Sequence, residues 1–343
     1  FDEVFIHGAG GIGQNFPGSQ GAVPGTSYFD PFIKHNGQIV KTKGYCTDVF
    51  FKQALGWMKE QKEKPFFAYI ATNAPHGPFI VADNYKKMYA DHTKIDKQQA
   101  FFGMISNIDE NMGLLMNKLD AWGLAENTLL IYMTDNGSSV GSKVFNAGMK
   151  GGKGSANQGG SRVPLFMRLP GKMTAGLEVD RMARHYDMVP TLVELAGGEY
   201  PSARDGRSLV PLIENPKAEW EDRNTFFHGG RWNKKGMEGR WGKGDTTPEG
   251  SKYKKFAVRN EKWRLVGKEL YDIEADPGET KDVSAQHPEV AAEMLKAFDK
   301  WWDEVRPLMV NEDASLDTGK PFIELYEKQK ASGGIPNWIE PKL

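Results

Sequence analysis

The clearest pattern in the chain is a helical repeat of apolar residues between positions 96 and 122. Apolar side chains recur there at spacings of three and four: Phe101, Met104, Ile105, Ile108, Met112, Leu115, Leu119 and Trp122. This spacing places them on one face of a long amphipathic helix, and Gly123 is a residue suited to ending it. The pattern predicts another helix over residues 45–61 and a short apolar strand over 65–71.

Two further strands are predicted at residues 128–133 and 163–168, and a helix near 187–197 follows them. Helices that alternate with buried apolar strands indicate an α/β domain. We assign this domain to residues 1–215 and expect a mostly parallel or mixed sheet with helices on its faces.

The pattern changes near residue 220, where short strands separated by turns replace the longer alternation. An amphipathic helix at about 287–305 follows these strands. This order predicts a small antiparallel sheet with one packing helix, which we assign to residues 216–306. Residues 307–343 are polar, contain Pro and Gly, and are expected to form a C-terminal tail.

Composition narrows the class of protein. Hydrophobic residues make up 39% of the chain and charged residues 26%, which is typical of a globular protein. Lys and Arg number 44 against 45 Asp and Glu, so no charge excess points to nucleic acid or to an anionic membrane. No apolar run approaches the roughly 18 residues of a spanning helix, so no transmembrane segment is expected.

Two features of the sequence bear on processing and redox chemistry. Cys46 is the single cysteine, which excludes an intrachain disulfide and a cysteine-based zinc site. The chain starts at Phe1 in strand-like sequence, without an initiator Met or a signal peptide. We therefore expect further sequence upstream of Phe1.

Asp135 and Asn136 follow the predicted strand at 128–133. A carboxylate beside an amide carbonyl supplies two hard oxygen ligands, which suit calcium or magnesium. The same residues are also common in turns that cap a strand. From spacing alone such a turn is the more frequent explanation.

Three basic residues lie in other loops of the same predicted domain. His76, between two prolines, has the chemistry to bind an anion or to protonate a leaving group. Lys153, flanked by glycines, suits a point-charge contact to an oxyanion. Taken alone, each is also explained as a solvent-exposed loop residue, and for His76 that explanation is the favoured one. Arg162 is either an anion clamp or part of an ion pair that holds its loop, and we favour the ion pair.

The order and spacing of these motifs resemble the type I, formylglycine-dependent sulfatases of the alkaline-phosphatase superfamily. The matching stretches are Tyr45-Cys46-Thr47-Asp48, Pro65-Phe66-Phe67, Ala74-Pro75-His76-Gly77-Pro78, Thr134-Asp135-Asn136-Gly137, Gly151-Gly152-Lys153-Gly154-Ser155, Gly159-Gly160-Ser161-Arg162-Val163-Pro164 and Asp187-Met188-Val189-Pro190-Thr191. A further stretch near the end, Leu270-Tyr271-Asp272-Ile273, is similar to the family's small C-terminal domain. The resemblance covers roughly residues 1–306.

The resemblance implies an alkaline-phosphatase-like mixed sheet flanked by helices and the hydrolysis of sulfate monoesters. The family's nucleophile is a formylglycine made from Cys or Ser, and a divalent cation polarises the sulfate. By motif, Asp135 and Asn136 would be two metal ligands, for calcium or alternatively magnesium. His76 and Lys153 would be the catalytic pair that binds the sulfate. A sulfated small molecule or carbohydrate would be the substrate, in the periplasm or outside the cell.

The sequence also departs from the family. No Cys-x-Pro-Ser-Arg or Ser-x-Pro-Ser-Arg motif occurs in it, and Gln158 stands where the family usually has an acidic residue. Cys46 lies in a different context, and we expect it to pack in the core. We therefore expect a sulfatase chain that lacks its formylglycine and is inactive alone. The alternatives are a phosphate or phosphonate ester hydrolase of the same superfamily, or a non-catalytic relative that binds sulfated glycans.

Overall fold

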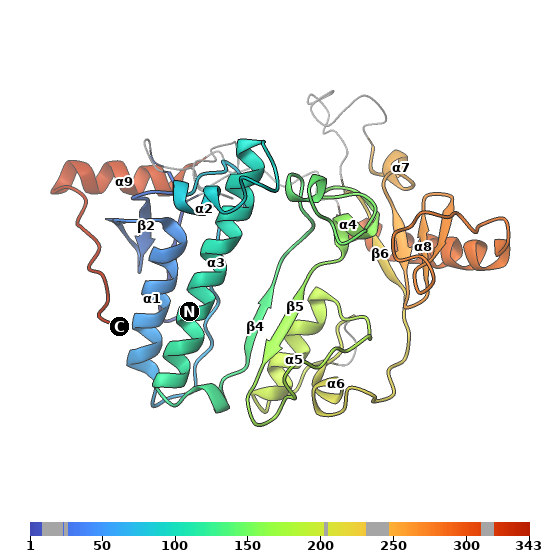
Figure 1. The fold of residues 1–343 in the computed structure, drawn as a ribbon, viewed down its shortest axis with the longest axis horizontal. Coiled ribbons are helices and arrows are strands. Elements are labelled where there is room, and N and C mark those ends of the chain that lie inside the picture. The colour runs from blue at the N-terminus through green and yellow to red at the C-terminus, as the bar shows by residue number, and fades with distance from the viewer. Residues whose placement is uncertain (9–22, 24–26, 202–204, 231–246, 310–318) are drawn as a thin grey trace. The chain divides into compact units, whose positions relative to one another are not determined.

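The computed structural model describes the chain except for residues 9–22, 24–26, 202–204, 231–246 and 310–318 (Figure 1). The described residues form two compact units. The first unit combines residues 1–128 with 313–343, and the second contains residues 129–312. The three-part domain division expected from the sequence stays a prediction.

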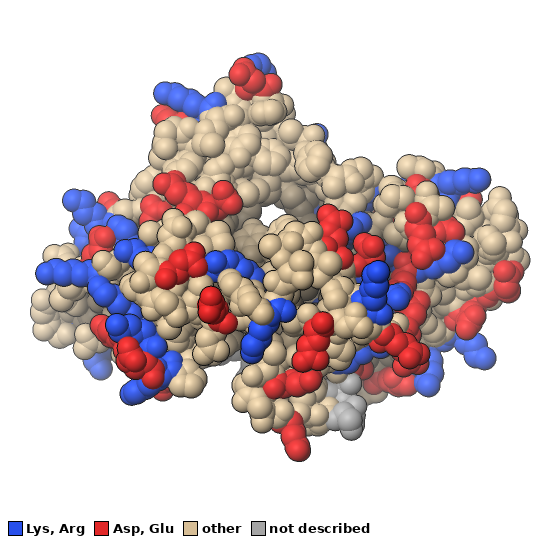
Figure 2. Space-filling model, turned by 60° about the horizontal axis from the view of Figure 1, so that its bottom comes forward, with Lys and Arg blue, Asp and Glu red and all other residues tan. Residues whose placement is uncertain are grey.

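Charged side chains of both signs lie on the face of the molecule that Figure 2 draws. Figure 2 shows Lys and Arg side chains mixed with Asp and Glu over the face that it draws, in keeping with a net charge of −1. Across the residues that the structure describes, no helix is long and apolar enough to cross a bilayer.

The first unit combines a small sheet with long helices. Its elements are β1 (Phe5–Ile6), β2 (Phe32–His35), β3 (Gln38–Lys41), α1 (Cys46–Gln61), α2 (Asp83–Lys87), α3 (Asp96–Ala121), the short 3-10 helix η1 (Ala125–Asn127) and α9 (Pro321–Ser332). The strands pair antiparallel in the order β1-β2-β3. Both helices predicted in this part, α1 and α3, are confirmed to within a residue at each end.

Helices α1 and α3 lie side by side (Figure 1) and bury the apolar face that the sequence predicts. Polar groups also join them, because Asn107 and Asn111 each donate a side-chain hydrogen bond of 2.8 Å to Asp48 Oδ1. Helix α9, near the C-terminus of the chain, contacts the sheet of this unit. Gln329 of α9 exchanges two hydrogen bonds with the backbone of Ile39 in β3.

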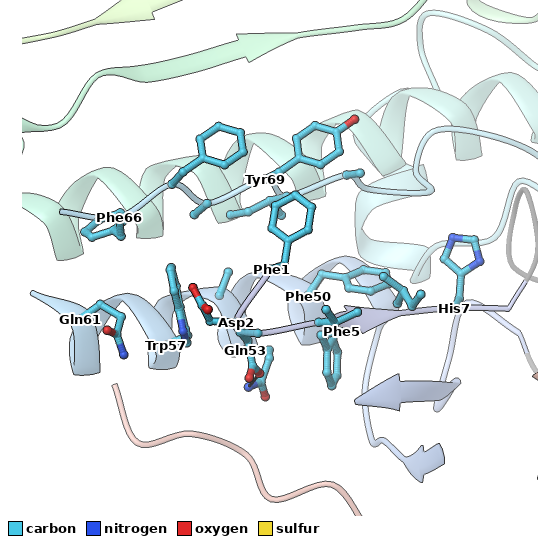
Figure 3. Close-up of a pocket in the computed structure, with 18 of the residues that line it drawn as sticks. Phe1, Asp2, Phe5, His7, Phe50, Gln53, Trp57, Gln61, Phe66 and Tyr69 are labelled. Atoms are coloured by element: carbon cyan, nitrogen blue, oxygen red, sulfur yellow. Dashed lines mark hydrogen bonds between the residues drawn. The ribbon is translucent and has the colours of Figure 1, made fainter. Parts of the chain in front are cut away.

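The segment 65–71 differs from its prediction. It is extended, and its side chains alternate between exposed and half-buried positions as in a strand. It pairs with no strand among the described residues, so the predicted strand is not formed there. Phe67 and Tyr69 are 57% and 75% exposed. Phe66, Tyr69 and Trp57 of α1 are among the residues that line a cavity of about 1100 Å³, and Figure 3 shows their side chains. Apolar alternation selects an extended backbone, but a strand also needs a hydrogen-bonded neighbour.

The second unit contains two sheets. Its elements are β4 (Leu130–Met133), η2 (Gly141–Lys143), α4 (Gln158–Ser161), β5 (Leu165–Arg168), η3 (His185–Asp187), α5 (Met188–Leu195), α6 (Val210–Glu214), β6 (Thr225–Phe227), α7 (Pro248–Ser251), β7 (Ala257–Arg259), β8 (Trp263–Val266), β9 (Glu269–Asp272) and α8 (Pro288–Met309). β4 and β5 pair antiparallel with Ile131 opposite Met167. One face of this pair packs on a cluster that includes Met188 and Leu212 of α5 and α6.

The predicted small C-terminal sheet is confirmed. β6, β7, β8 and β9 form a four-stranded antiparallel sheet. Helix α8 packs on it through Met294, Phe298 and Trp302, and the rings of Phe298 and Phe256 are 4.4 Å apart. The α/β class is confirmed as well. Within the described residues, all pairs of named strands are antiparallel, and one isolated bridge, between Lys41 and Asn337, is parallel.

Candidate functional site

Two loops of the second unit lie against each other at the end of β4. The first carries Asp135 and Asn136, directly after the strand, and the second is the glycine-rich segment 151–160 that carries Lys153. Backbone hydrogen bonds join them. The N–H of Lys153 donates to Ser138 O at 3.0 Å, and the N–H of Gly137 donates to Gly160 O at 3.2 Å. Three of the four predicted site residues therefore lie on loops that contact each other directly.

Glycine is required where these loops meet. A Cβ atom on Gly137 would lie 1.9 Å from the carbonyl oxygen of Gly159. A Cβ on Gly152 would lie 2.8 Å from Ser138 O, and one on Gly160 would lie 2.3 Å from Ser155 O. Because the obstructing atoms belong to backbone, they cannot move aside as a flexible side chain would. The glycines allow the two loops to pack backbone to backbone.

Asp135 and Asn136 present adjacent polar groups at the loop surface. The Asn136 amide donates to Asp135 Oδ2, so the two side chains point to the same place. His185 Nε2 lies 2.9 Å from the carbonyl oxygen of Thr134, at the start of this turn. A carboxylate and an amide carbonyl are hard donors that fit Ca²⁺ or Mg²⁺. Calcium takes about six to eight oxygen ligands, and the described residues contain no group of three or more His, Cys, Asp or Glu side chains suited to a metal.

Lys153 is exposed, and none of the described carboxylates forms an ion pair with it. Its loop lines a cavity of about 720 Å³. The other lining residues are Ser138, Ser139, Ser142, Lys143, Gly151, Gly152, Gly154, Ser155, Ala156, Asn157, Lys255 and Val266. The ammonium group of Lys153 is therefore available to an anion in this cavity.

A buried ion pair anchors the loop of Lys153. Arg264 of β8 donates to Ala156 O at 3.1 Å through Nε and to Ser161 Oγ at 2.7 Å through Nη2. Arg264 Nε also lies 3.2 Å from Glu279 Oε1, and the two side chains are 2% and 0% exposed. Burial lowers the pKa of Arg264 to about 10, while Glu279 acts to raise it, so the guanidinium is charged at neutral pH.

The sequence interpretation assigned the anchoring ion pair to Arg162, and this is wrong. Arg162 is exposed and forms no ion pair with the described residues, whereas Arg264 makes the contacts that hold the loop. An arginine inside the apolar strand Trp263–Val266 was the available signal, because a charge in a buried strand requires a partner.

Gln158 has a structural role. Its side-chain Nε2 donates to Pro277 O at 2.6 Å, and its backbone N–H donates to Glu279 Oε2 at 2.9 Å. The side chain is buried, with 2% of the residue exposed. Gln158 therefore joins the loop of Lys153 to the turn that follows β9.

His76 lies in the first unit, and hydrogen bonds within its loop and one from Tyr28 hold it. Its backbone N–H donates to Asn73 O at 2.9 Å, and its carbonyl oxygen accepts from the Tyr28 hydroxyl at 2.6 Å. Its Nδ1 lies 2.8 Å from Gly77 O. A carbonyl only accepts, so Nδ1 carries a proton and donates it. The convergence of His76 with Asp135, Asn136 and Lys153 stays a prediction.

Cys46 packs in the core, as expected. It is fully buried at the start of α1, with Sγ 4.0 Å from Thr47 Oγ1. Burial raises the pKa of its thiol to about 12, so the reactive thiolate is absent at neutral pH. Cys46 is therefore not an activated nucleophile.

Comparison with known proteins decides the family. A model of the sulfatase family matches residues 11–198, more than half of the chain. The chain belongs to the sulfatase family. A second model, of the C-terminal part of N-sulphoglucosamine sulphohydrolase, matches residues 156–304 of this sulfatase chain. The family implies a metal ion and a formylglycine residue in general terms.

The chain is similar in sequence to curated sulfatases and in fold to a solved structure. A sulfatase of Formosa agariphila is 27% identical over 72% of this chain and 47% of its own length. Human steryl-sulfatase is 30% identical over 59% of this chain and 36% of its own length. A solved structure of Ps i-CgsB in complex with k-i-k-neocarrahexaose is 26% identical, with a TM-score of 0.70, and the match covers 94% of this chain and 68% of that one. The sulfatase chain thus spans less than half the length of these two curated relatives.

Proposed function

We propose that this chain supplies part of an active site that hydrolyses sulfate monoesters with the help of a divalent cation. One observation carries the proposal: backbone hydrogen bonds place the loop of Asp135 and Asn136 directly against the loop of Lys153. Oxygen ligands for a cation and a positive charge for an oxyanion thus lie on neighbouring loops. Membership of the sulfatase family supports this assignment of chemistry.

Each residue has a distinct task in this proposal. The Asp135 carboxylate and the Asn136 carbonyl would hold the cation, which we propose is calcium with magnesium as the alternative, since both ligands are hard oxygens. When bound, the cation would polarise the sulfate. Lys153 would neutralise charge on the sulfate oxygens, which stabilises a transition state in which that charge grows. His76 would contact the sulfate through its imidazole ring, which its hydrogen bond to Gly77 O orients.

The nucleophile is assigned to residues outside positions 1–343. No Cys or Ser in the sequence has the x-Pro-Ser-Arg context, and the one cysteine is buried and protonated. We propose a formylglycine as this nucleophile, which the family supports. The substrate class that we propose is a sulfated carbohydrate, and the related Ps i-CgsB structure in complex with k-i-k-neocarrahexaose supports it. The proposed location is the periplasm or the extracellular space.

The test is an assay of a longer polypeptide that contains this sequence and a formylglycine motif, compared with the chain as given. An aryl sulfate and the matched aryl phosphate are the substrates, with calcium present. We expect sulfate hydrolysis by the longer polypeptide and its loss in Asp135→Ala. Asp303→Ala, which changes an exposed aspartate on α8, is the control and should keep activity. Preferred hydrolysis of the phosphate would favour the phosphate or phosphonate hydrolase, and binding without turnover would favour the non-catalytic relative.

A further inference from the structure

Three lysines from separate parts of the second unit line the cavity beside the Gly-rich loop. Lys143 is the last residue of η2, Lys153 lies in the loop, and Lys255 comes two residues before β7. Among the described residues that line the cavity, none is acidic. The fold thus gathers three positive charges, more than 100 positions apart at the extremes, around one space of about 720 Å³.

Several lysines of the same unit contact a carboxylate, among them Lys150 with Glu269, Lys252 with Asp299 and Lys262 with Asp272. Lys143, Lys153 and Lys255 are exposed, and no ion pair joins any of them to a carboxylate in the described part of the chain. Like charges around one cavity raise its positive potential, so a bound anion interacts favourably with all of them.

The rest of the lining supplies hydrogen-bond donors. Ser138, Ser142 and Ser155 contribute hydroxyl groups. Sulfate oxygens accept hydrogen bonds, and bonds to a charged acceptor are the strong ones. The cavity volume falls in the range of about 300–1000 Å³ that is usual for sites of drug-sized molecules. The cavity therefore has room for more than a single sulfate group.

We propose that Lys143 and Lys255 form an anion subsite beside Lys153, which binds a second sulfate group of a multiply sulfated carbohydrate. The proposal rests on the proposed function in one respect, that Lys153 contacts the sulfate group that is cleaved. A carbohydrate with two sulfate groups then engages all three lysines, whereas one with a single sulfate engages Lys153 alone. The subsite therefore selects substrates by their number of sulfate groups.

The experiment compares two probes that differ by one sulfate group, glucosamine 6-sulfate and N-sulfoglucosamine 6-sulfate. Their binding to the purified chain is measured by calorimetry at low ionic strength. Exposed charge pairs contribute about 0.2–1 kcal/mol, equivalent to about 1.4- to 5-fold in affinity. We expect Lys143→Gln and Lys255→Gln each to weaken binding of the disulfated sugar by this factor. Neither substitution should change binding of the monosulfated sugar, and added salt should reduce the difference.

Lys254→Gln is the matched control, because Lys254 is exposed and adjacent in sequence but does not line the cavity. The inference is overturned if the wild-type chain binds the two sugars with equal affinity. It is also overturned if Lys143→Gln and Lys255→Gln weaken the binding of both sugars equally. Failure of the proposed function gives a different result. If a longer polypeptide does not hydrolyse sulfate esters, but its preference for the disulfated sugar still depends on Lys143 and Lys255, the hydrolase is refuted and the subsite is not. Hydrolysis without that dependence refutes the subsite alone.

Discussion

The loops around Lys153 and the segment around His76 are held in place in different ways. In the second unit, the loop of Lys153 is fixed by contacts from distant parts of the chain, chiefly the buried pair of Arg264 and Glu279. In the first unit, His76 is fixed by short-range bonds and by one hydroxyl, that of Tyr28. The position of Lys153 thus depends on the small C-terminal sheet, whereas the hydrogen bonds described for His76 come from its own loop and from Tyr28.

The two regions also differ in how completely their backbones are paired. The glycine-rich loop hydrogen-bonds to the loop after β4. The segment 65–71, which leads into the loop of His76, has strand-like alternation and no strand partner in the described chain. Substitutions in the small C-terminal sheet should therefore affect the loop of Lys153, and substitution of Tyr28 should affect the loop of His76.

The largest expected effect concerns a group that neither region supplies, a nucleophile. The chain alone should hydrolyse an aryl sulfate several powers of ten below the about 1–1000 s⁻¹ of ordinary enzymes, because removing a covalent nucleophile costs that much. A continuous assay with calcium present measures it. Cys46→Ala should leave the residual rate unchanged, since burial keeps the thiol protonated. Ordinary turnover that disappears in Cys46→Ala would make Cys46 the nucleophile.

The second largest effect is expected when the buried ion pair between Arg264 and Glu279 is broken. Glu279→Gln leaves the Arg264 charge buried without its partner, and such losses cost about 3–5 kcal/mol in free energy of unfolding. Denaturant unfolding of the second unit measures this cost. Lys262→Gln, which breaks a more exposed pair with Asp272 at 3.8 Å, is the control and should cost less than about 1 kcal/mol.

A double variant separates stability from loop position. Arg264→Met with Glu279→Leu removes both buried charges, and apolar replacement of a buried pair is often neutral or stabilising. We expect it to recover much of the stability lost in Glu279→Gln. The double variant also removes the hydrogen bonds from Arg264 to Ala156 O and Ser161 Oγ, so binding of a sulfated sugar through Lys153 should be weaker than in the wild-type chain. Binding as tight as in the wild-type chain would show that the pair does not position the loop.

The third effect tests the contact between the two loops. Gly137→Ala places a Cβ 1.9 Å from the Gly159 carbonyl oxygen. Overpacking of this kind lowers the free energy of unfolding by about 1–3 kcal/mol. Gly113→Ala is the matched substitution in helix α3, where a Cβ meets no atom within 4 Å. Gly113→Ala should stabilise the chain by about 0.5–1 kcal/mol, because alanine has a higher helix propensity than glycine. Thermal unfolding should therefore move in opposite directions for the two variants, and a stabilising Gly137→Ala would refute the packing argument.

The sequence predicts those parts of the fold that depend on local periodicity. α1, α3 and α8 follow from the spacing of apolar residues, and the small antiparallel sheet follows from its turns. The segment 65–71 could not be predicted correctly in this way, since alternation does not say whether a neighbouring strand is present.

The candidate site was predictable only in part. Motifs selected Asp135, Asn136 and Lys153, and the structure places these residues on touching loops. The anchor formed by Arg264 and Glu279 was missed, because the two residues are separated in sequence from the loop that they hold. The ionic role given to Arg162 was assigned by proximity in sequence, which says little about pairing across a fold.

The smallest expected effect tests the local support of His76. Tyr28→Phe removes the hydroxyl that donates to His76 O but keeps the ring, which stacks on Tyr45 at 5.9 Å. Loss of one hydrogen bond costs about 0.5–1.5 kcal/mol, and unfolding of the first unit measures it. The freed carbonyl should also shift the NMR signals of the His76 imidazole. Tyr45→Phe removes a comparable bond to Ile80 O, 2.9 Å long, and should cost as much without moving the His76 signals. If both variants moved them equally, the position of His76 would depend on general packing rather than on the Tyr28 hydroxyl.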